Sequence, residues 1–173
     1  LAASGSCDFV VEFAPTVSGA PADTIDISYN NGATTAHATR DVLGNGVDPA
    51  VLVVSNAPFY DFGDRAIGSN NDVTLQINNT GGFAASGIGG SGLAAPFSFK
   101  GGAYPGTGGS CGATLSAGGN CSIIVTYSPT AASADSDTIL IDYNDGLAAQ
   151  QSTRDIQGTG VIAAFISISD GAT

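Results

Sequence analysis

The sequence predicts an all-β protein, and three observations lead to that prediction. Apolar and polar residues alternate with a period of two in several short runs, which is the pattern of strands with one buried face. Asn-Gly and Asp-Gly pairs follow two of these runs and suit the positive backbone angles of tight hairpin turns. A long segment of the chain recurs 114 residues later without a gap, which indicates repeated modules.

The repeat joins the start of the chain to its second half. The segment "SCDFVVEFAPTVSGAPADTIDISYNNG" from Ser6 has a later copy, "NCSIIVTYSPTAASADSDTILIDYNDG", from Asn120. The same shift places Cys7 on Cys121, and "TRD" and two following glycines recur in step. The sequence therefore predicts three parts: the C-terminal part of an immunoglobulin-like module in residues 1–47, a complete module in residues 48–161, and the first strand of a following module in residues 162–173.

Each element of the complete module follows from its local pattern. "VLVVSN" from Val51 is rich in β-branched residues, and "DVTLQINN" from Asp72 alternates, with Val73, Leu75 and Ile77 on one face. The Gly-rich stretch 82–110 predicts exposed loops around short strands near 84–88 and 97–99. "CSIIVTY" and "DTILIDY" each place a set of side chains on one face: Cys121, Ile123, Val125, Tyr127, Ile139, Ile141 and Tyr143. Seven or eight short strands in roughly 100 residues predict a two-sheet sandwich of immunoglobulin type.

The first copy keeps this parity, so we expect its residues 7–13 to form a strand as well. Half a module cannot close a sandwich, and inward side chains such as Phe9, Val11 and Phe13 would lie open to water. Either the polypeptide is longer and contains the missing strands, or a neighbouring subunit donates one. The strand "FISISD" from Phe165 is the candidate donor. We favour the longer polypeptide.

The composition argues against several classes of function, among them the binding of nucleic acid. Lys and Arg number 4 and Asp and Glu 15, which gives a formal net charge of -11. Such a chain is repelled by nucleic acid and by anionic membranes, since it cannot neutralise phosphates. Hydrophobic residues make up 43% of the chain, enough to bury a core. The sequence contains no run of 18 or more apolar residues, so it predicts no membrane span.

The cysteines carry the most specific chemistry in the sequence. Cys111 and Cys121 flank "GATLSAGGN", which has the composition of a hairpin tip. We expect a disulfide that closes this loop, and therefore an oxidising compartment. Metal binding is the alternative, although the chain has no CxxC pair and a single His. The matching partner of Cys7 would lie ten residues upstream, before residue 1, so Cys7 is unpaired in this chain.

Other candidate residues indicate structure rather than chemistry, and no cofactor is expected. His37 lies in a polar stretch without a neighbouring nucleophile and is interpreted as solvated. The Arg-Asp pairs at 40–41 and 154–155 are interpreted as structural ion pairs or strand-edge charges. Four aspartates could collect calcium between modules but lack the alternating spacing that wraps one ion: Asp135, Asp137, Asp142 and Asp145. Four aromatic residues could form a sugar platform, although core packing is favoured: Tyr60, Phe83, Phe97 and Tyr104.

Several segments of the complete module resemble the choice-of-anchor D family. They are "FYDFGDRAIGSNNDVTLQINNTGG" from Phe59, "APFSF", "CGATLSAGGNCSIIVTYSPTAA" and "STRDIQGTGV", and they follow in order over residues 50–161. That family is an immunoglobulin-like repeat of bacterial surface and secreted proteins, related to Hydin-type immunoglobulin-like domains. The resemblance implies a string of modules outside the cell. It implies no catalytic residues, and the pair Cys111 and Cys121 is its only special chemistry.

The sequence therefore predicts a non-enzymatic extracellular structural protein, in which tandem modules form a surface fibre, stalk or adhesin shaft. Strand donation between subunits would let such modules polymerise. The expected partners are neighbouring repeats or identical subunits, with a surface glycan or a protein receptor as a further partner. The alternative is a glycan- or calcium-binding cell-surface adhesion module.

Overall fold

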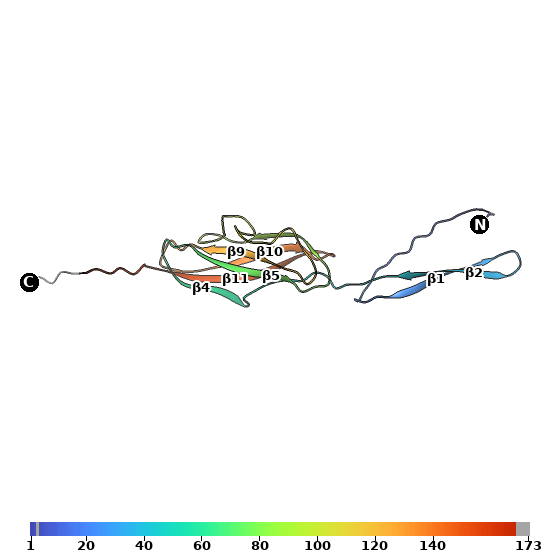
Figure 1. Ribbon diagram of the computed structural model, residues 1–173, viewed down its shortest axis with the longest axis horizontal. Helices are drawn as coiled ribbons and strands as arrows, with labels where there is room; N and C mark the ends of the chain where they lie inside the picture. Colours follow the sequence, from blue (N-terminus) through green and yellow to red (C-terminus); the bar gives the residue numbers. More distant parts are fainter. Residues whose placement is uncertain (3, 169–173) are drawn as a thin grey trace, which may run out of the picture. The chain divides into compact units, whose positions relative to one another are not determined.

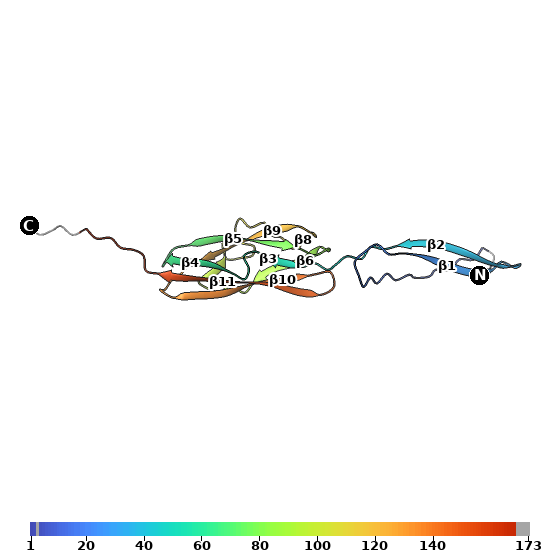
Figure 2. The same cartoon turned by 90° about the horizontal axis from the view of Figure 1, so that it is seen from below.

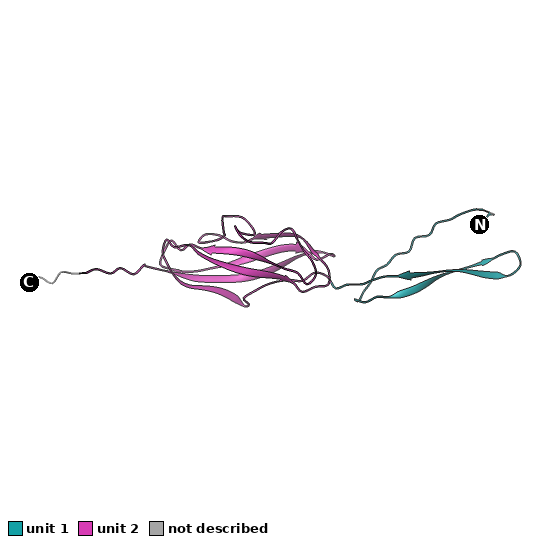
Figure 3. Ribbon diagram, viewed as in Figure 1, with its two compact units in different colours: residues 1–48 teal, residues 49–173 magenta. Residues whose placement is uncertain are grey.

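The computed structural model describes residues 1–2 and 4–168. These residues form two compact units, which we call unit 1 (Leu1–Asp48) and unit 2 (Pro49–Thr173) (Figure 3). Among the described residues, no helix has the length and apolar character that crossing a membrane requires.

Unit 2 is a two-sheet β-sandwich of the immunoglobulin type that the sequence predicts. One sheet has the strand order β4-β11-β10-β6-β8 and the other has the order β3-β5-β9-β7. Figures 1 and 2 show these strands in two layers. All pairings are antiparallel except that of β4 with β11. The strands are β3 (Leu52–Val54), β4 (Phe59–Ala66), β5 (Asn71–Asn79), β6 (Ala85–Ser91), β7 (Phe97–Phe99), β8 (Thr114–Leu115), β9 (Asn120–Tyr127), β10 (Ala134–Asn144) and β11 (Ala149–Val161).

The predicted parity of the strands is confirmed in the core of unit 2. The side chains expected to face inward from β5, β9 and β10 are buried there, apart from Val73, which is half-buried at the edge of the core. Leu75 on β5 lies opposite Ile123 on β9, and both are fully buried. Aromatic rings fill one end of the core, where Tyr127 stacks on Phe97 with ring centroids 4.7 Å apart. Apolar burial on two facing sheets therefore holds the sandwich together.

Two strands are not evident from the sequence. β4 contains three charged residues and Gly63, which adopts a φ of +66°, so its alternation is weak. Its pairing with β11 is also irregular, with a register shift between Gln157 and Thr159. The strand β8 has only two residues. In both cases tertiary pairing, rather than a local pattern, defines the strand.

The prediction of a hairpin tip between Cys111 and Cys121 is wrong. The chain after Cys111 enters β8, which pairs with β6 in the five-stranded sheet. It then crosses to β9, which pairs with β5 and β7 in the other sheet. The segment between Cys111 and Cys121 therefore passes from one sheet to the other, and the disulfide spans this crossover.

Unit 1 contains one long hairpin, formed by β1 (Ala22–Asn30) and β2 (Thr35–Leu43). The strand expected over residues 7–13 does not form, and this segment is an extended, exposed stretch without ladder pairing. Its counterpart β9 pairs with β5 and β7 rather than with the β10–β11 hairpin. The described residues of unit 1 include no counterpart of β5 or β7, so the segment has no neighbour to which it can bond.

The hairpin of unit 1 nevertheless has the register of its counterpart in unit 2. Ala22 pairs with Leu43, and 114 residues later Ser136 pairs with Gln157. The Thr24 hydroxyl donates to Asp41 Oδ1 at 2.7 Å, and the corresponding Thr138 hydroxyl donates to Asp155 Oδ1 at 2.8 Å. The repeat in the sequence is thus also a repeat in hydrogen bonding.

The predicted C-terminal strand falls partly outside the described residues. Residues 162–168 form no strand, and Phe165, Ile166 and Ile168 are exposed. Residues 169–170 of "FISISD" lie outside the described part of the chain.

Candidate functional site

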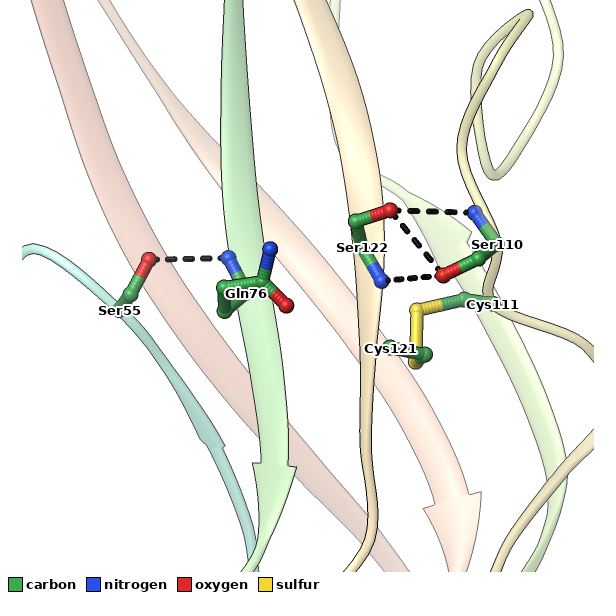
Figure 4. Close-up of a disulfide and its surroundings, with 6 residues drawn as sticks. All are labelled: Ser55, Gln76, Ser110, Cys111, Cys121 and Ser122. Atoms are coloured by element: carbon green, nitrogen blue, oxygen red, sulfur yellow. Dashed lines mark hydrogen bonds between the residues drawn. A yellow bond between two sulfur atoms is a disulfide. The ribbon is translucent and has the colours of Figure 1, made fainter.

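The disulfide lies at the edge of the core of unit 2. The Sγ atoms of Cys111 and Cys121 are 1.98 Å apart, and both residues are buried. Beside them the Ser110 amide donates to the Ser122 carbonyl at 2.9 Å. The Ser122 amide donates to Ser110 Oγ at 2.9 Å (Figure 4). Two sulfurs bonded to each other offer no thiolate to a metal ion, so the pair serves to tie the loop before β8 to β9.

Cys7 is an exposed free thiol in the extended segment of unit 1. Its counterpart Cys121 belongs to β9, and the partner of Cys121 belongs to the segment before β8. The described residues of unit 1 have no counterpart of that segment. The unpaired state of Cys7 therefore has the same origin as the missing ladder of residues 7–13.

The four aspartates considered for calcium are occupied separately by hydrogen bonds. Asp135 accepts from the Tyr127 hydroxyl at 2.7 Å, Asp137 from the amide of Ala94 at 2.7 Å, and Asp142 from Gln151 at 2.7 Å. Across the described ranges, no three His, Cys, Asp or Glu side chains gather closely enough to hold a metal.

Asp145 is the most enclosed of the four and shapes the turn between β10 and β11. Its Oδ1 accepts from the amides of Leu147 and Ala148, each at 2.7 Å. These two donors lower the pKa of its carboxyl group below the usual value, because they favour the charged form. Asn31 fills the same role in unit 1, where its Oδ1 accepts from the amides of Ala33 and Thr34 at 2.9 Å. The Asp145 carboxylate is therefore part of the turn between β10 and β11.

The recurring Arg-Asp pairs are not ion pairs between neighbours. Arg154 is buried and donates from Nη2 to the Val54 carbonyl at 2.6 Å and from Nη1 to the Pro58 carbonyl at 2.7 Å. It therefore anchors the link between β3 and β4. Its counterpart Arg40 is exposed, since the described part of unit 1 holds no equivalent of those carbonyls. Asp155 bonds to Thr138 across the hairpin instead of to Arg154.

His37 is exposed, as the sequence suggests. Its Nδ1 lies 2.9 Å from Asp26 Oδ1 across the β1–β2 hairpin, on a solvated surface. No cysteine or serine hydrogen-bonds to the ring. The pair has the geometry of a surface ion pair, and such pairs contribute little to stability.

The four aromatic residues considered as a sugar platform do not form one surface. Phe97 is buried against Tyr127, and Tyr60 packs against the core, edge-on to Phe62. Tyr104 also packs inward and meets Phe99 edge-on at 5.7 Å, with a buried hydroxyl that lacks a hydrogen-bond partner. Burial raises the pKa of that hydroxyl. Of the four, Phe83 alone is exposed.

Asn79 is an important polar residue that the strand pattern alone did not single out. It is 2% exposed, and its Nδ2 donates to the carbonyls of Phe83, Leu115 and Ser116 at 2.8–3.2 Å. Its Oδ1 accepts from the amides of Val51 and Gly81. The signal was available in the sequence, because the alternation of Leu75 and Ile77 places Asn79 on the inward face.

The feature of this chain most suited to binding is a set of exposed core positions in unit 1. Phe9, Val11 and Phe13 are 50–56% exposed, and Ile27 and Tyr29 are 44% and 49% exposed. Their counterparts in unit 2 lie in the buried core. We call these five residues the open core positions.

The sequence matches no protein-family model, and it has no significant match to a curated protein. The VesB protease of Vibrio cholerae is similar in structure, with 18% identity and a TM-score of 0.50 over 64% of this chain and 32% of that chain. A protein of unknown function from Porphyromonas gingivalis has 12% identity and a TM-score of 0.51, over 83% of this chain and 67% of that one. The ASH/PapD-like domain 7 of human CEP192 has 13% identity and a TM-score of 0.47, over 68% of this chain and 89% of the domain.

At these identities the likeness concerns the fold alone. The match spans about a third of the VesB chain, so it does not extend to that protein as a whole. The chain is an all-β protein, and the strand order of unit 2 is that of a two-sheet β-sandwich of immunoglobulin type.

Proposed function

We propose that this chain is a stretch of tandem immunoglobulin-like modules in a non-enzymatic extracellular protein, where it serves as a surface fibre, stalk or adhesin shaft. The observation that carries the proposal is the repeat between the two units. Residues 6–47 match residues 120–161 in sequence, and their hairpins share register and hydrogen bonds. A protein made of such repeats gains length by adding modules, each with its own core.

The polar side chains of unit 2 support a structural role. Asp135, Asp145 and Asn79 each hold a turn, a strand or a neighbouring side chain in place. Arg154, the buried cation of the sandwich, binds backbone carbonyls. General acid–base or nucleophilic chemistry needs two or three polar side chains that converge on one accessible point. In our proposal the polar side chains named above hold the scaffold in place instead.

Several observations favour a position outside the cell. The disulfide between Cys111 and Cys121 is stable in an oxidising compartment. The resemblance to the choice-of-anchor D family points to bacterial surface and secreted proteins. The formal net charge of -11 keeps such a chain soluble and away from anionic partners. The partners would be neighbouring modules or identical subunits.

Labelling of intact source cells tests this proposal. An antibody raised against residues 48–161 should bind cells that have not been permeabilised, and electron microscopy should place the label along a fibre or stalk. An antibody to a cytoplasmic protein serves as the control for cell integrity. Label that appears only after permeabilisation would contradict the extracellular role. Label on compact surface particles, rather than along a fibre or stalk, would contradict the structural role.

A further inference from the structure

The open core positions of unit 1 have the geometry of a sandwich core without its covering half. Phe13, which is half exposed, lies against Gly44, where a Cβ would meet its ring. The counterpart Tyr127 lies against Gly158 in the same way, but it is fully buried. The exposure of successive side chains in the extended segment also alternates, since Val10 is 96% exposed and its neighbours Phe9 and Val11 are less exposed. Unit 1 therefore keeps one close ring–glycine contact and the alternating faces of a module's C-terminal part.

In unit 2, the covering half comes from residues that precede Cys121 in the chain. The Tyr127 ring stacks on Phe97 of β7 at 4.7 Å and meets Phe62 of β4 at 5.4 Å. The strand β5 pairs with β9, and β6 pairs with β10. The covering strands β4, β5, β6 and β7 all lie between Phe59 and Phe99. The described part of unit 1 contains no counterpart of them.

Two further residues of unit 1 lack the partner that their counterparts have. Arg154 binds carbonyls of Val54 and Pro58, whereas Arg40 is exposed. Cys121 is bonded to Cys111, whereas Cys7 is a free thiol. Both missing partners belong to the N-terminal part of a module. Apolar burial, a cation site and a thiol thus point independently to the same missing segment.

We propose that a segment of the same polypeptide, located ahead of Cys7, covers the open core positions of unit 1. This segment supplies strands like those of residues 50–115 and a cysteine that pairs with Cys7. Forming that bond removes two protons and two electrons from two thiols, and a disulfide of the oxidising compartment accepts them and is reduced to two thiols. The inference rests on the proposed repeat, and its disulfide also needs the oxidising compartment of the proposed extracellular role.

A second copy of the chain is a poorer occupant. Its own residues 50–115 are engaged in a closed sandwich, where Leu75 and Ile77 are fully buried. Its residues 164–168 are exposed. Residues 166–168 correspond to β3, whose ladder partner is β5. Since the described residues of unit 1 have no counterpart of β5, one donated strand would find no ladder to join in the register of unit 2.

A fusion of residues 48–114 ahead of Leu1 of the full chain tests the inference. In this protein the added copy of Cys111 lies ten residues before Cys7, the spacing of the disulfide in unit 2. We expect Cys7 to become resistant to iodoacetamide without reductant, while it takes up one label in the unfused chain. We also expect hydrogen exchange of amides 8–13 to slow by more than about 100-fold, because they gain a ladder partner.

Two controls separate folding of the new sandwich from other effects. A matched fusion with Leu75→Asp and Ile77→Asp in the added copy alone should leave Cys7 reactive and amides 8–13 unprotected. Unit 2 of the same molecule serves as the internal standard for correct folding. The unfused chain should also be mixed with a peptide of residues 162–168 and examined over a range of its own concentration.

The outcomes are decisive in both directions. Protection of Cys7 and of amides 8–13 in the fusion, and not in the control fusion, supports the inference. An unprotected segment in a fusion whose unit 2 is folded overturns it. Protection of the unfused chain by the peptide, or by self-association at high concentration, also overturns it and assigns the positions to a neighbouring subunit. None of these outcomes changes the result of labelling intact cells.

Discussion

At the scale of single residues, Asn79 shows how one buried side chain can fix several loops. Its five hydrogen bonds reach the start of β3, the turn after β5 and the residues around the end of β8. These bonds supply partners to backbone groups close to the core, and the Ser116 carbonyl also accepts from the Gly119 amide. A buried polar group without a partner costs about 1 to 3 kcal/mol.

We expect Asn79→Ala to lower the free energy of unfolding of unit 2 by about 2 to 3 kcal/mol, because several backbone groups lose their partner at once. Chemical denaturation measures this change. Gln76→Ala is the matched control, since Gln76 lies on the same strand and faces solvent, and it should change stability by less than about 0.5 kcal/mol. Equal effects of the two substitutions would contradict the role given to Asn79.

Tyr127 supplies a second residue-scale prediction, which concerns alkaline pH. Burial and the bond to Asp135 raise the pKa of its hydroxyl to about 12. The unfolded chain loses this proton near pH 10, so the stabilisation is complete below pH 10 and is lost as the pH rises from 10 to 12. The loss amounts to about 2 to 3 kcal/mol.

Tyr127→Phe should remove this component of the pH dependence. The variant should be less stable than the native chain at pH 7 by about 1 to 2 kcal/mol, because the bond to Asp135 is lost. The difference between the two proteins should shrink between pH 10 and 12 in denaturation curves. A difference that stays constant over that range would contradict the assignment. Phe13 and Pro21 occupy the positions of Tyr127 and Asp135 in unit 1, so this pair is specific to unit 2.

At the scale of elements, Arg154 connects the first two strands of the sandwich to its last. Arg154→Ala leaves the carbonyls of Val54 and Pro58 without their charged donor. We expect the free energy of unfolding of unit 2 to fall by about 2 to 4 kcal/mol. Arg40→Ala is the matched control, because Arg40 is exposed, and it should have almost no effect. A large effect of Arg40→Ala would contradict the view that its partners are missing.

The disulfide adds a constraint on the crossover between the two sheets. Replacing both Cys111 and Cys121 by Ala should lower the free energy of unfolding by about 2 to 3 kcal/mol on the chain-entropy model for a short loop. Thermal and chemical denaturation with and without reductant measure it. Reduction should not destabilise the double variant further. A double variant as stable as the native chain would show that the bond adds no net stability.

Elements differ in how well the sequence predicts them, and the reason is physical. β5 and β10 have one buried face and one face that is more exposed, and β9 has one buried face and one that is largely half-buried, so the alternation of the three strands is visible in the residues. β4 and β8 depend on pairing with residues far along the chain and have weak local patterns. Residues 7–13 have the right pattern but no ladder partner among the described residues. Parity thus predicts which side chains face inward, and only the assembled sheets decide whether a strand forms.

The same limit applies to the candidate site. The pair Cys111 and Cys121 was predicted from the short segment that the two residues flank, but the crossover that the disulfide spans was not. Arg154 is predicted only as a recurring residue, because its partners are the carbonyls of Val54 at the end of β3 and of Pro58, both far along the chain. Its position on the face of Ile156 was the available signal that it points inward.

At the scale of the whole molecule, the chain contains one closed sandwich and one set of open core positions. The 114-residue repeat relates them, because the open positions match buried ones residue by residue. In a protein of tandem modules, each core is complete only when the N-terminal and C-terminal parts of a module are both present. We therefore infer that unit 1 is the later part of a module whose earlier part lies ahead of Cys7.

A non-reducing peptide map of the natural protein is the measurement that decides where the earlier part of this module lies. Digestion and mass spectrometry identify the sulfur partner of Cys7 in material isolated from its source. We expect a disulfide to a cysteine ten residues earlier in the same polypeptide, in a sequence similar to that around Cys111. A free Cys7 thiol, or a Cys7–Cys7 bond between two copies, would contradict it.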